Sequence, residues 1–232
     1  MKALILIENM IKINVLIFIL VLSINTMVAQ KQYLTVKDSD KEALDLWKKS
    51  KNKLETANTL VLDFKMTIQQ VDMKPEIING IAKQKAQKYF IEAGNQYYYC
   101  DGTSLILYKK VENIAQINSL DENSGNVFTP SSLLKQFDDK KFIFVMEQIK
   151  GKSDVRSVLL KPTEKRSEYS KIQLLINSKT LIPSDIKIFN KDGSRTFIKI
   201  NSMTLNQNIE NNVFIFNKTD HPGVSVEDLR MD

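Results

Sequence analysis

Residues able to perform acid–base, nucleophilic or metal chemistry are scarce in this chain. It has one histidine, His221, and one cysteine, Cys100. With no second histidine and no thiol pair, no zinc site can be assembled. His221 precedes Pro222-Gly223, a turn sequence, so we interpret it as structural and not as part of a catalytic triad. We predict neither a metal site nor a cofactor.

Nucleophile motifs are present only in isolation. Ser-x-x-Lys occurs at Ser50–Lys53 and at Ser132–Lys135, but the partner motifs of penicillin-recognising enzymes are missing. The seven glycines form no phosphate-binding loop. Cys100 follows three tyrosines and is interpreted as a small buried residue. The sequence therefore predicts a protein that is not an enzyme, with a hydrolase using Cys100 or Ser132 as the alternative that rapid native-state thiol labelling would favour.

The N-terminus has the composition of a targeting segment. Lysines precede an almost purely apolar run at residues 14–24, which is too short to span a bilayer. We predict a secretory signal peptide over residues 1–29, cleaved near Ala29-Gln30, then a loose leader over 30–39 and a single domain over 40–232. The mature protein is expected to be soluble and exported.

The net charge of +6 comes from scattered lysines with acids between them. An exported protein does not meet the genome, so nucleic acid is excluded as a partner. Weak attraction to anionic lipid heads or to an acidic partner fits the charge better. A lone cysteine allows no internal disulfide, so the core must be sufficient by itself.

The alternation of apolar and polar residues is strongest from Thr59 to Gln70. At a period of two, one face carries Leu60, Leu62, Phe64, Met66 and Ile68, while the other is mainly polar. The segment is about twice the usual strand length. We expect it to curl within an antiparallel sheet whose concave face is apolar.

Other segments complete the predicted domain. Asp40 can cap a helix over Lys41–Asn58, which should pack on the sheet through Trp47 and Leu54. Asp101-Gly102 and Lys191–Ser194 predict hairpin turns. A short helix is expected over Pro130–Phe137, and Val213–Phe216 is expected to be a last strand before an exposed tail. The pattern predicts an α+β fold of about ten strands.

In order and spacing, a set of landmarks resembles the LolA family, the periplasmic carriers of outer-membrane lipoproteins. The landmarks are Asp63-Phe64, Gly80, Tyr89-Phe90, Asp101-Gly102 with Leu105 and Tyr108, Thr129-Pro130, Leu159-x-x-Pro162, Asp192-Gly193, and the ending Phe214-x-Phe216, Pro222-Gly223-Val224-x-Val226 and Asp228-x-Arg230. The chain departs from the family at Ala86-Gln87, where many members carry Arg-Pro, at Ile106, where they carry tryptophan, and at Met66, where they carry glutamine. In the family, this arginine is expected to control closure of the empty cavity. Because this chain lacks it, another contact must control closure here.

The resemblance implies a half-open, incomplete antiparallel β-barrel, with a long N-terminal helix and a short lid helix over a hydrophobic cavity. The protein would be a periplasmic monomer. Its partners would be acylated lipoproteins, an ATP-driven (ABC-type) extractor in the inner membrane and an acceptor at the outer membrane. The expected cavity residues are Leu60, Leu62, Phe64, Met66, Ile68, Phe90, Tyr99 and Leu107, and the lid residues are Leu133, Leu134 and Phe137.

Two other functions are compatible with the same sequence features. A related half-barrel could sense lipid or misplaced lipoprotein and signal to a membrane partner. A plain envelope β-domain would instead have a core filled by its own side chains.

Overall fold

A computed structural model divides the chain into two units, Met1–Leu34 and Thr35–Asp232. The structure describes residues 35–120, 137–147, 149, 151 and 153–230, all within the second unit. The predicted signal peptide, part of the leader and most of the predicted lid helix, including Leu133 and Leu134, lie outside the described residues.

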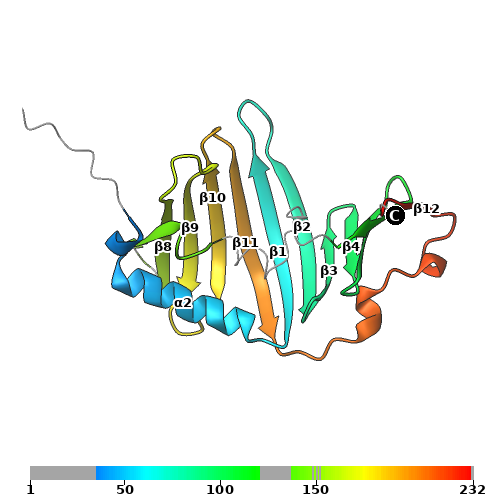
Figure 1. Ribbon diagram of the computed structural model, residues 1–232, viewed down its shortest axis with the longest axis horizontal. Helices are drawn as coiled ribbons and strands as arrows, with labels where there is room; N and C mark the ends of the chain where they lie inside the picture. The colour runs from blue at the N-terminus through cyan, green and yellow to red at the C-terminus, as the bar shows by residue number, and fades with distance from the viewer. Residues whose placement is uncertain (1–34, 121–136, 148, 150, 152, 231–232) are drawn as a thin grey trace, which may run out of the picture. The chain divides into compact units, whose positions relative to one another are not determined.

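Twelve strands form one sheet in the described part of the chain (Figure 1). They are β1 (Thr59–Gln69), β2 (Glu76–Lys85), β3 (Lys88–Ala93), β4 (Gln96–Cys100), β5 (Ser104–Lys109), β6 (Ile114–Ser119), β7 (Phe142–Glu147), β8 (Val155–Pro162), β9 (Tyr169–Asn177), β10 (Pro183–Asn190), β11 (Arg195–Leu205) and β12 (Ser225–Asp228). The other elements are α2 (Lys41–Glu55) and the 3₁₀ turns η1 (Val36–Asp38), η2 (Asn211–Phe214) and η3 (Lys218–Asp220). With one α-helix among the described residues, the fold is mostly β rather than the expected α+β.

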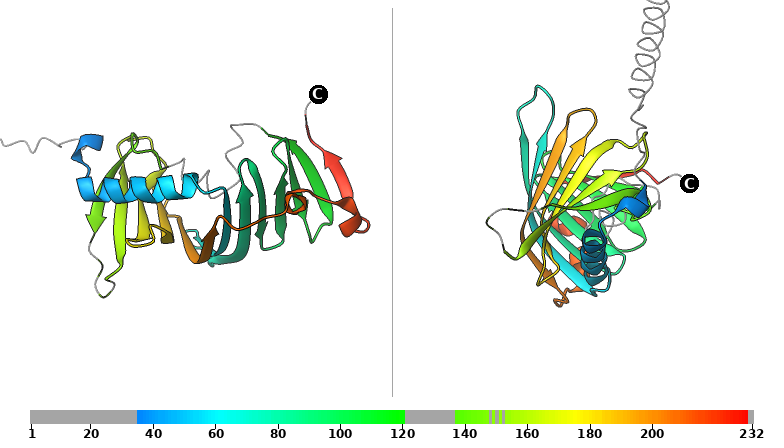
Figure 2. Two further views of the ribbon diagram at one scale, coloured as in Figure 1. Left: turned by 90° about the horizontal axis from the view of Figure 1, so that it is seen from below. Right: turned by 90° about the vertical axis from the view of Figure 1, so that its left-hand side faces the viewer.

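The sheet is open and curved. Its strand order is β12-β6-β5-β4-β3-β2-β1-β11-β10-β9-β8-β7, so β12 and β7 are the two edges (Figure 2). Neighbours pair antiparallel except β12, which runs parallel to β6. The long central strand β1 has a register irregularity against β11 between Asp63 and Phe64, a feature that increases local twist.

The C-terminal segment differs from its prediction in two ways. Val213–Phe216 is not a strand, because η2 occupies Asn211–Phe214. The tail residues Ser225–Asp228 are exposed, as expected, but they form the unpredicted strand β12 beside β6. Both differences have the same cause: four-residue segments carry too little periodicity to define their state, and their partners are more than one hundred residues away in the chain.

Helix α2 covers the inner face of the sheet at the β7 side. Its buried residues Ala43, Leu46, Trp47 and Leu54 recur at helical spacing and belong to the main core cluster. The Trp47 ring stacks on Phe144 of β7 at 6.1 Å between centroids and lies 6.0 Å from the Phe137 ring. This confirms the expected packing of the helix through Trp47 and Leu54.

Asp40 precedes α2 but makes no side-chain cap, contrary to the prediction. Its carboxylate instead accepts a hydrogen bond from the Met146 backbone N–H at 2.7 Å, and its own N–H donates to the Phe144 carbonyl at 2.8 Å. The Phe144 N–H donates to Ser39 Oγ at 3.1 Å. The start of the helix thus satisfies backbone groups of the edge strand β7, which would otherwise be free to pair with another chain.

The predicted turns are present. Gly193, with φ +89°, lies in the turn between β10 and β11. At the other hairpin, Cys100 pairs with Leu105, so the connection is longer than the predicted tight turn. There the Asp101 carboxylate accepts hydrogen bonds from Thr103 and Ser104, which lower the pKa of Asp101.

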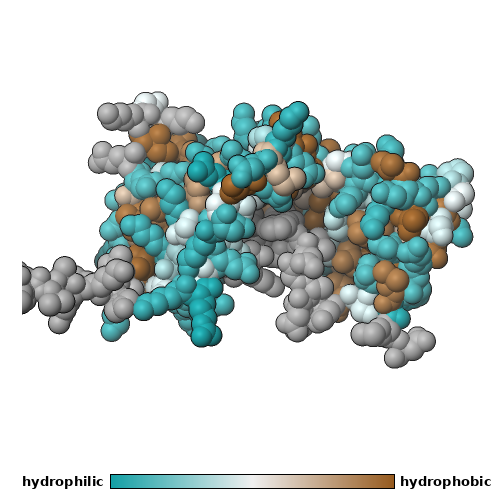
Figure 3. Space-filling model, turned by 90° about the horizontal axis from the view of Figure 1, so that it is seen from above, coloured by the Kyte–Doolittle hydropathy of each residue, from teal (hydrophilic) through white to brown (hydrophobic). Residues whose placement is uncertain are grey.

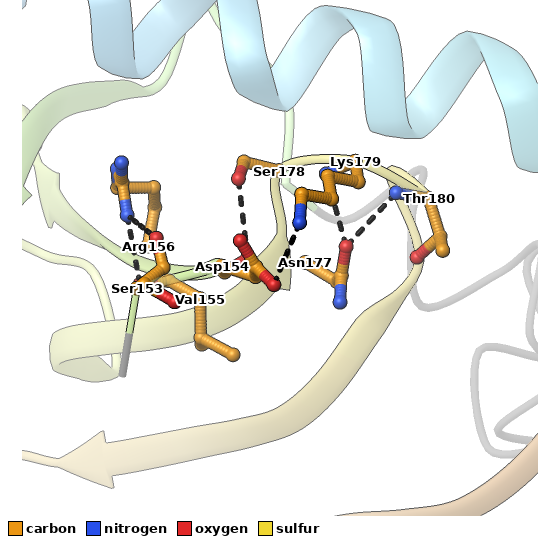
Figure 4. A network of polar contacts seen from close by, with 8 residues as sticks. All are labelled: Ser153, Asp154, Val155, Arg156, Asn177, Ser178, Lys179 and Thr180. Carbon is orange, nitrogen blue, oxygen red and sulfur yellow. Dashed lines mark hydrogen bonds and ion pairs between the residues drawn. The ribbon is translucent and has the colours of Figure 1, made fainter. Parts of the chain in front are cut away.

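A polar network ties the β9–β10 turn to the start of β8. Asn177 Oδ1 accepts hydrogen bonds from the backbone N–H groups of Lys179 and Thr180, each at 2.9 Å (Figure 4). The Lys179 ammonium lies 3.0 Å from the Asp154 carboxylate. Lys53 of α2 donates to the Thr180 carbonyl at 2.8 Å, so the same turn also holds the end of the helix.

Candidate functional site

The inner face of the sheet is set by the alternation of β1. Leu60, Leu62 and Phe64 are buried on this face, and Met66 and Ile68 continue it half-buried. Residues directly opposite each other in an antiparallel pair share a face. The register can therefore be followed from β1 to every strand on either side.

Toward β7, the inner face is filled and covered. Its residues join the core cluster with α2 and are almost fully buried: Phe144, Val158, Leu160, Ile172, Leu174, Ile186 and Ile188. The Phe137 side chain is also fully buried here, with its ring 6.4 Å from Phe142. This half of the sheet forms an ordinary core.

Toward β6, part of the inner face keeps apolar surface accessible, although Ala82, Ile91 and Leu105 on it are buried. Phe64 pairs with Gly80, Ile91 pairs with Tyr98, and Tyr98 pairs with Leu107. The half-buried apolar residues of this face are Met66, Ile68, Ile78, Tyr89, Tyr98 and Leu107. Figure 3 looks from above and shows hydrophobic residues in separate patches among hydrophilic ones.

Cys100 lies on the same inner face and is fully buried. Burial raises the pKa of its thiol, and burial likewise raises the pKa of the neighbouring Tyr89. A thiol that stays protonated is a poor nucleophile. Cys100 therefore packs as a small residue, as expected from sequence.

The register separates two predicted cavity residues from the others. Phe90 pairs with Lys83 and Tyr99 pairs with Phe90, which places both on the outer face, opposite to Leu107. Their rings lie 5.1 Å apart, and Tyr99 also contacts Phe216 of the C-terminal segment at 5.5 Å. Of the eight predicted residues, six share the inner face, and these are Leu60, Leu62, Phe64, Met66, Ile68 and Leu107.

Sequence reasoning missed Ile78, Tyr89 and Tyr98 on the inner face. The two-residue Gly94-Asn95 connection pairs Ala93 with Gln96, which fixes which residues of β3 and β4 share a face. Gly80 is opposite Phe64 on the inner face and is itself paired with Ala93, so Ala93 and Gln96 also lie on the inner face. Counting in steps of two from Gln96 places Tyr98 on the inner face and Tyr99 on the outer face. The turn length was the signal that could have found them.

His221 has a structural environment on the outer face. Its ring is parallel to Phe216 at 4.8 Å and lies 4.2 Å from Tyr108. No group of three or more potential metal ligands occurs within the described residues.

The Ser-x-x-Lys motif in α2 does not form a catalytic pair. Ser50 Oγ is buried without a hydrogen-bond partner among the described residues, while the Lys53 ammonium bonds to Thr180. The second motif, Ser132–Lys135, lies outside the described residues.

The chain matches one protein-family model. The family model of the outer membrane lipoprotein carrier protein LolA matches residues 96–217. No curated protein sequence matches the chain significantly.

Solved structures show similar folds at low identity. An uncharacterized conserved protein from Thermus thermophilus is 9% identical, with a TM-score of 0.50 over 82% of this chain and 98% of its own. An outer-membrane lipoprotein-sorting protein domain from Vibrio parahaemolyticus is 12% identical, with a TM-score of 0.42 over 78% and 98%. MucB from Pseudomonas aeruginosa, solved with MucA, is 10% identical, with a TM-score of 0.36 over 76% and 62%.

Proposed function

Because the chain belongs to the LolA family of outer membrane lipoprotein carrier proteins, we propose that it binds lipoprotein acyl chains on the inner face of its sheet and carries them between membranes. The family is one of non-enzymatic carriers. No helix in the described part of the chain is long and apolar enough to cross a membrane.

One observation supports this role above the others. Beyond the area covered by α2, the inner face presents half-buried apolar side chains, among them Met66, Ile68, Tyr98 and Leu107. Each methylene removed from water contributes about 0.8 kcal/mol, so an acylated protein cannot cross an aqueous space without a cover for its chains. Methionine, leucine and aromatic side chains can repack around chains of different shapes.

A lid, two membrane partners and a periplasmic location complete the proposed function. Leu133 and Leu134 would act as a lid that fills the half-open barrel when no cargo is present and moves away on loading, so that closure opposes tight binding. Cargo would be received from an inner-membrane extractor and passed to an outer-membrane acceptor in the periplasm. Fully buried Phe137, which contacts Trp47, would anchor the C-terminal end of this lid.

The two faces of the sheet provide a matched test. We compare binding of a fluorescent fatty-acyl probe to wild type, Leu107→Glu and Phe90→Glu, since both residues are half-buried but lie on opposite faces. Burying an unpaired carboxylate among acyl chains is costly, so Leu107→Glu should weaken binding by about tenfold or more. Phe90→Glu should leave it within about twofold, because its face is not the binding face. Equal effects of the two substitutions would contradict acyl binding on the inner face.

Depletion in cells tests the transport role separately. A carrier predicts lipoproteins stranded at the inner membrane. Normal sorting with an altered envelope stress response would instead identify a lipid sensor, in which case acyl binding would serve signalling.

A further inference from the structure

The outer face of the sheet carries positive charge over the four adjacent strands β1, β11, β10 and β9. The side chains on this face include five cations, which are Lys65, Lys171, Lys187, Arg195 and Lys199. Only two carboxylates, Asp63 and Asp185, share it, and each accepts a hydrogen bond from a neighbouring side chain. We call this group of cations the basic face.

Two of these lysines are placed against each other. Lys65 and Lys199 are directly opposite in the β1–β11 pair, and like charges in that position destabilise a sheet. In the part of the chain that the structure describes, no salt bridge involves Lys65, Lys187 or Lys199. Asp185 lies directly opposite Lys199 in the β10–β11 pair and offsets part of this cost, whereas the residues directly opposite Lys65 are Lys199 and Asn79. The local cost that remains at Lys65 is typical of a surface that serves binding.

The lysines surround a depression of the surface. Its volume is about 220 Å³, and it is lined by Lys65, Lys187 and Lys199 together with Thr67, Asp185 and Phe197. Lys65 and Lys199 are exposed at its rim, while Phe197 is half-buried. The depression thus combines ammonium groups with an apolar ring.

Aromatic rings extend the same surface. Phe197 and Phe189 contact edge-to-face at 6.0 Å. The Lys171 ammonium lies 4.8 Å from the Phe189 ring centroid, and the Arg195 guanidinium lies 6.0 Å from it. Cations next to half-buried aromatic rings are the combination that proteins place at the boundary between phosphate headgroups and acyl chains.

We propose that the basic face docks on the surface of a bilayer rich in anionic phospholipid, with a lipid phosphate in the depression between Lys65, Lys187 and Lys199. Lysine is a compact charge on a flexible stem, which suits phosphates dispersed over a plane. Because the basic face is opposite the inner face, docking leaves the inner face unobstructed. The proposal does not depend on acyl binding at the inner face.

The test measures sedimentation of the protein with vesicles of phosphatidylglycerol and phosphatidylcholine, and with vesicles of phosphatidylcholine alone. Each lysine near an anionic surface contributes roughly fivefold in affinity. Combined Lys65→Gln, Lys187→Gln and Lys199→Gln substitutions should weaken binding to the mixed vesicles on the order of 100-fold. Binding to phosphatidylcholine alone should be weak for wild type and variant.

A matched triple variant tests whether vesicle binding depends on the basic face or only on the net charge of the protein. Lys109→Gln, Lys110→Gln and Lys218→Gln remove the same charge from positions outside the basic face and should change binding by about twofold at most, because distant charges are screened. Equal losses in the two triple variants, or normal binding of the basic-face variant, would overturn the proposal. Wild-type binding should also fall steeply with salt, a measurement that does not rely on any variant folding correctly.

Two soluble competitors distinguish the source of the anion. Glycerol phosphate and poly-glutamate should each displace the protein from mixed vesicles only at concentrations far above that of the vesicle lipid. If glycerol phosphate binds as tightly as the vesicles, the depression is a site for free phosphate. If poly-glutamate binds as tightly and loses binding to the basic-face variant, the partner is an acidic protein. Either result would overturn docking on a bilayer.

Discussion

Phe64 and Gly80 face each other across the β1–β2 pair, and the ring of Phe64 occupies the space that a side chain on residue 80 would need. A Cβ built on Gly80 would overlap Phe64 Cζ and lie 2.5 Å from the Glu92 carbonyl oxygen. Gly80 is therefore required by close approach and not by a left-handed backbone. Both residues lie on the inner face, and Phe64 belongs to the main core cluster.

Replacing Gly80 by alanine should destabilise the fold by about 1–3 kcal/mol, because the added methyl group overpacks this contact. Urea unfolding followed by circular dichroism measures the change. Combining Gly80→Ala with Phe64→Leu should recover only part of the loss, since the Glu92 carbonyl still clashes. A Gly80→Ala protein as stable as wild type would show that the sheet separates easily at this point.

Removing the Trp47 side chain should cost about 3–5 kcal/mol, because it is 1% exposed and packs between Phe137 and Phe144. Thermal unfolding by calorimetry measures the loss. Trp47→Phe keeps an aromatic ring and should lose less. If both substitutions have the same small effect, α2 does not anchor this part of the core.

Asp40→Ala should lower the unfolding free energy by about 1 kcal/mol and increase aggregation, because it frees the Met146 N–H on the edge strand β7. Asp40→Asn retains an acceptor oxygen and serves as the control. Denaturant midpoints and light scattering at rising protein concentration measure the two effects. Equal behaviour of the Ala and Asn variants would mean that this hydrogen bond does not protect the edge.

High pH should destabilise the protein. Burial raises the pKa of Tyr89, Tyr98, Tyr99 and Tyr169 and of the Cys100 thiol in the folded state. Above about pH 9–10 the unfolded chain releases these protons while the folded chain retains them, so the unfolding free energy falls as pH rises. Below about pH 8 the groups are neutral in both states and contribute no pH dependence.

Urea unfolding at a series of alkaline pH values measures this decline. Tyr89→Phe removes one of the titrating groups and should make the decline shallower. Tyrosinate absorbance of the folded protein should lag behind that of the denatured protein during the titration. A native titration that coincides with the denatured one would refute the prediction.

The sequence by itself was sufficient for the features that depend on local patterns. The alternation of β1, the apolar stripe of α2 and the Asp192-Gly193 turn are encoded within short windows, because strand and helix periods place neighbouring residues on defined faces. Cys100 was likewise predicted as buried from its tyrosine-rich strand. The family landmarks, ordered along the chain, added an assignment that the family model confirms.

Only the tertiary structure decided which face of each strand lies on the inner face of the sheet. A period of two defines two faces for each strand but does not say which face meets the inner face of β1; a shift of one residue exchanges them. For this reason Phe90 and Tyr99 were predicted beside Leu107 but lie on the opposite face. The pairing of Asp40 with Met146 and the cross-strand contact of Lys65 with Lys199 depend on partners more than one hundred residues away, which no local pattern specifies.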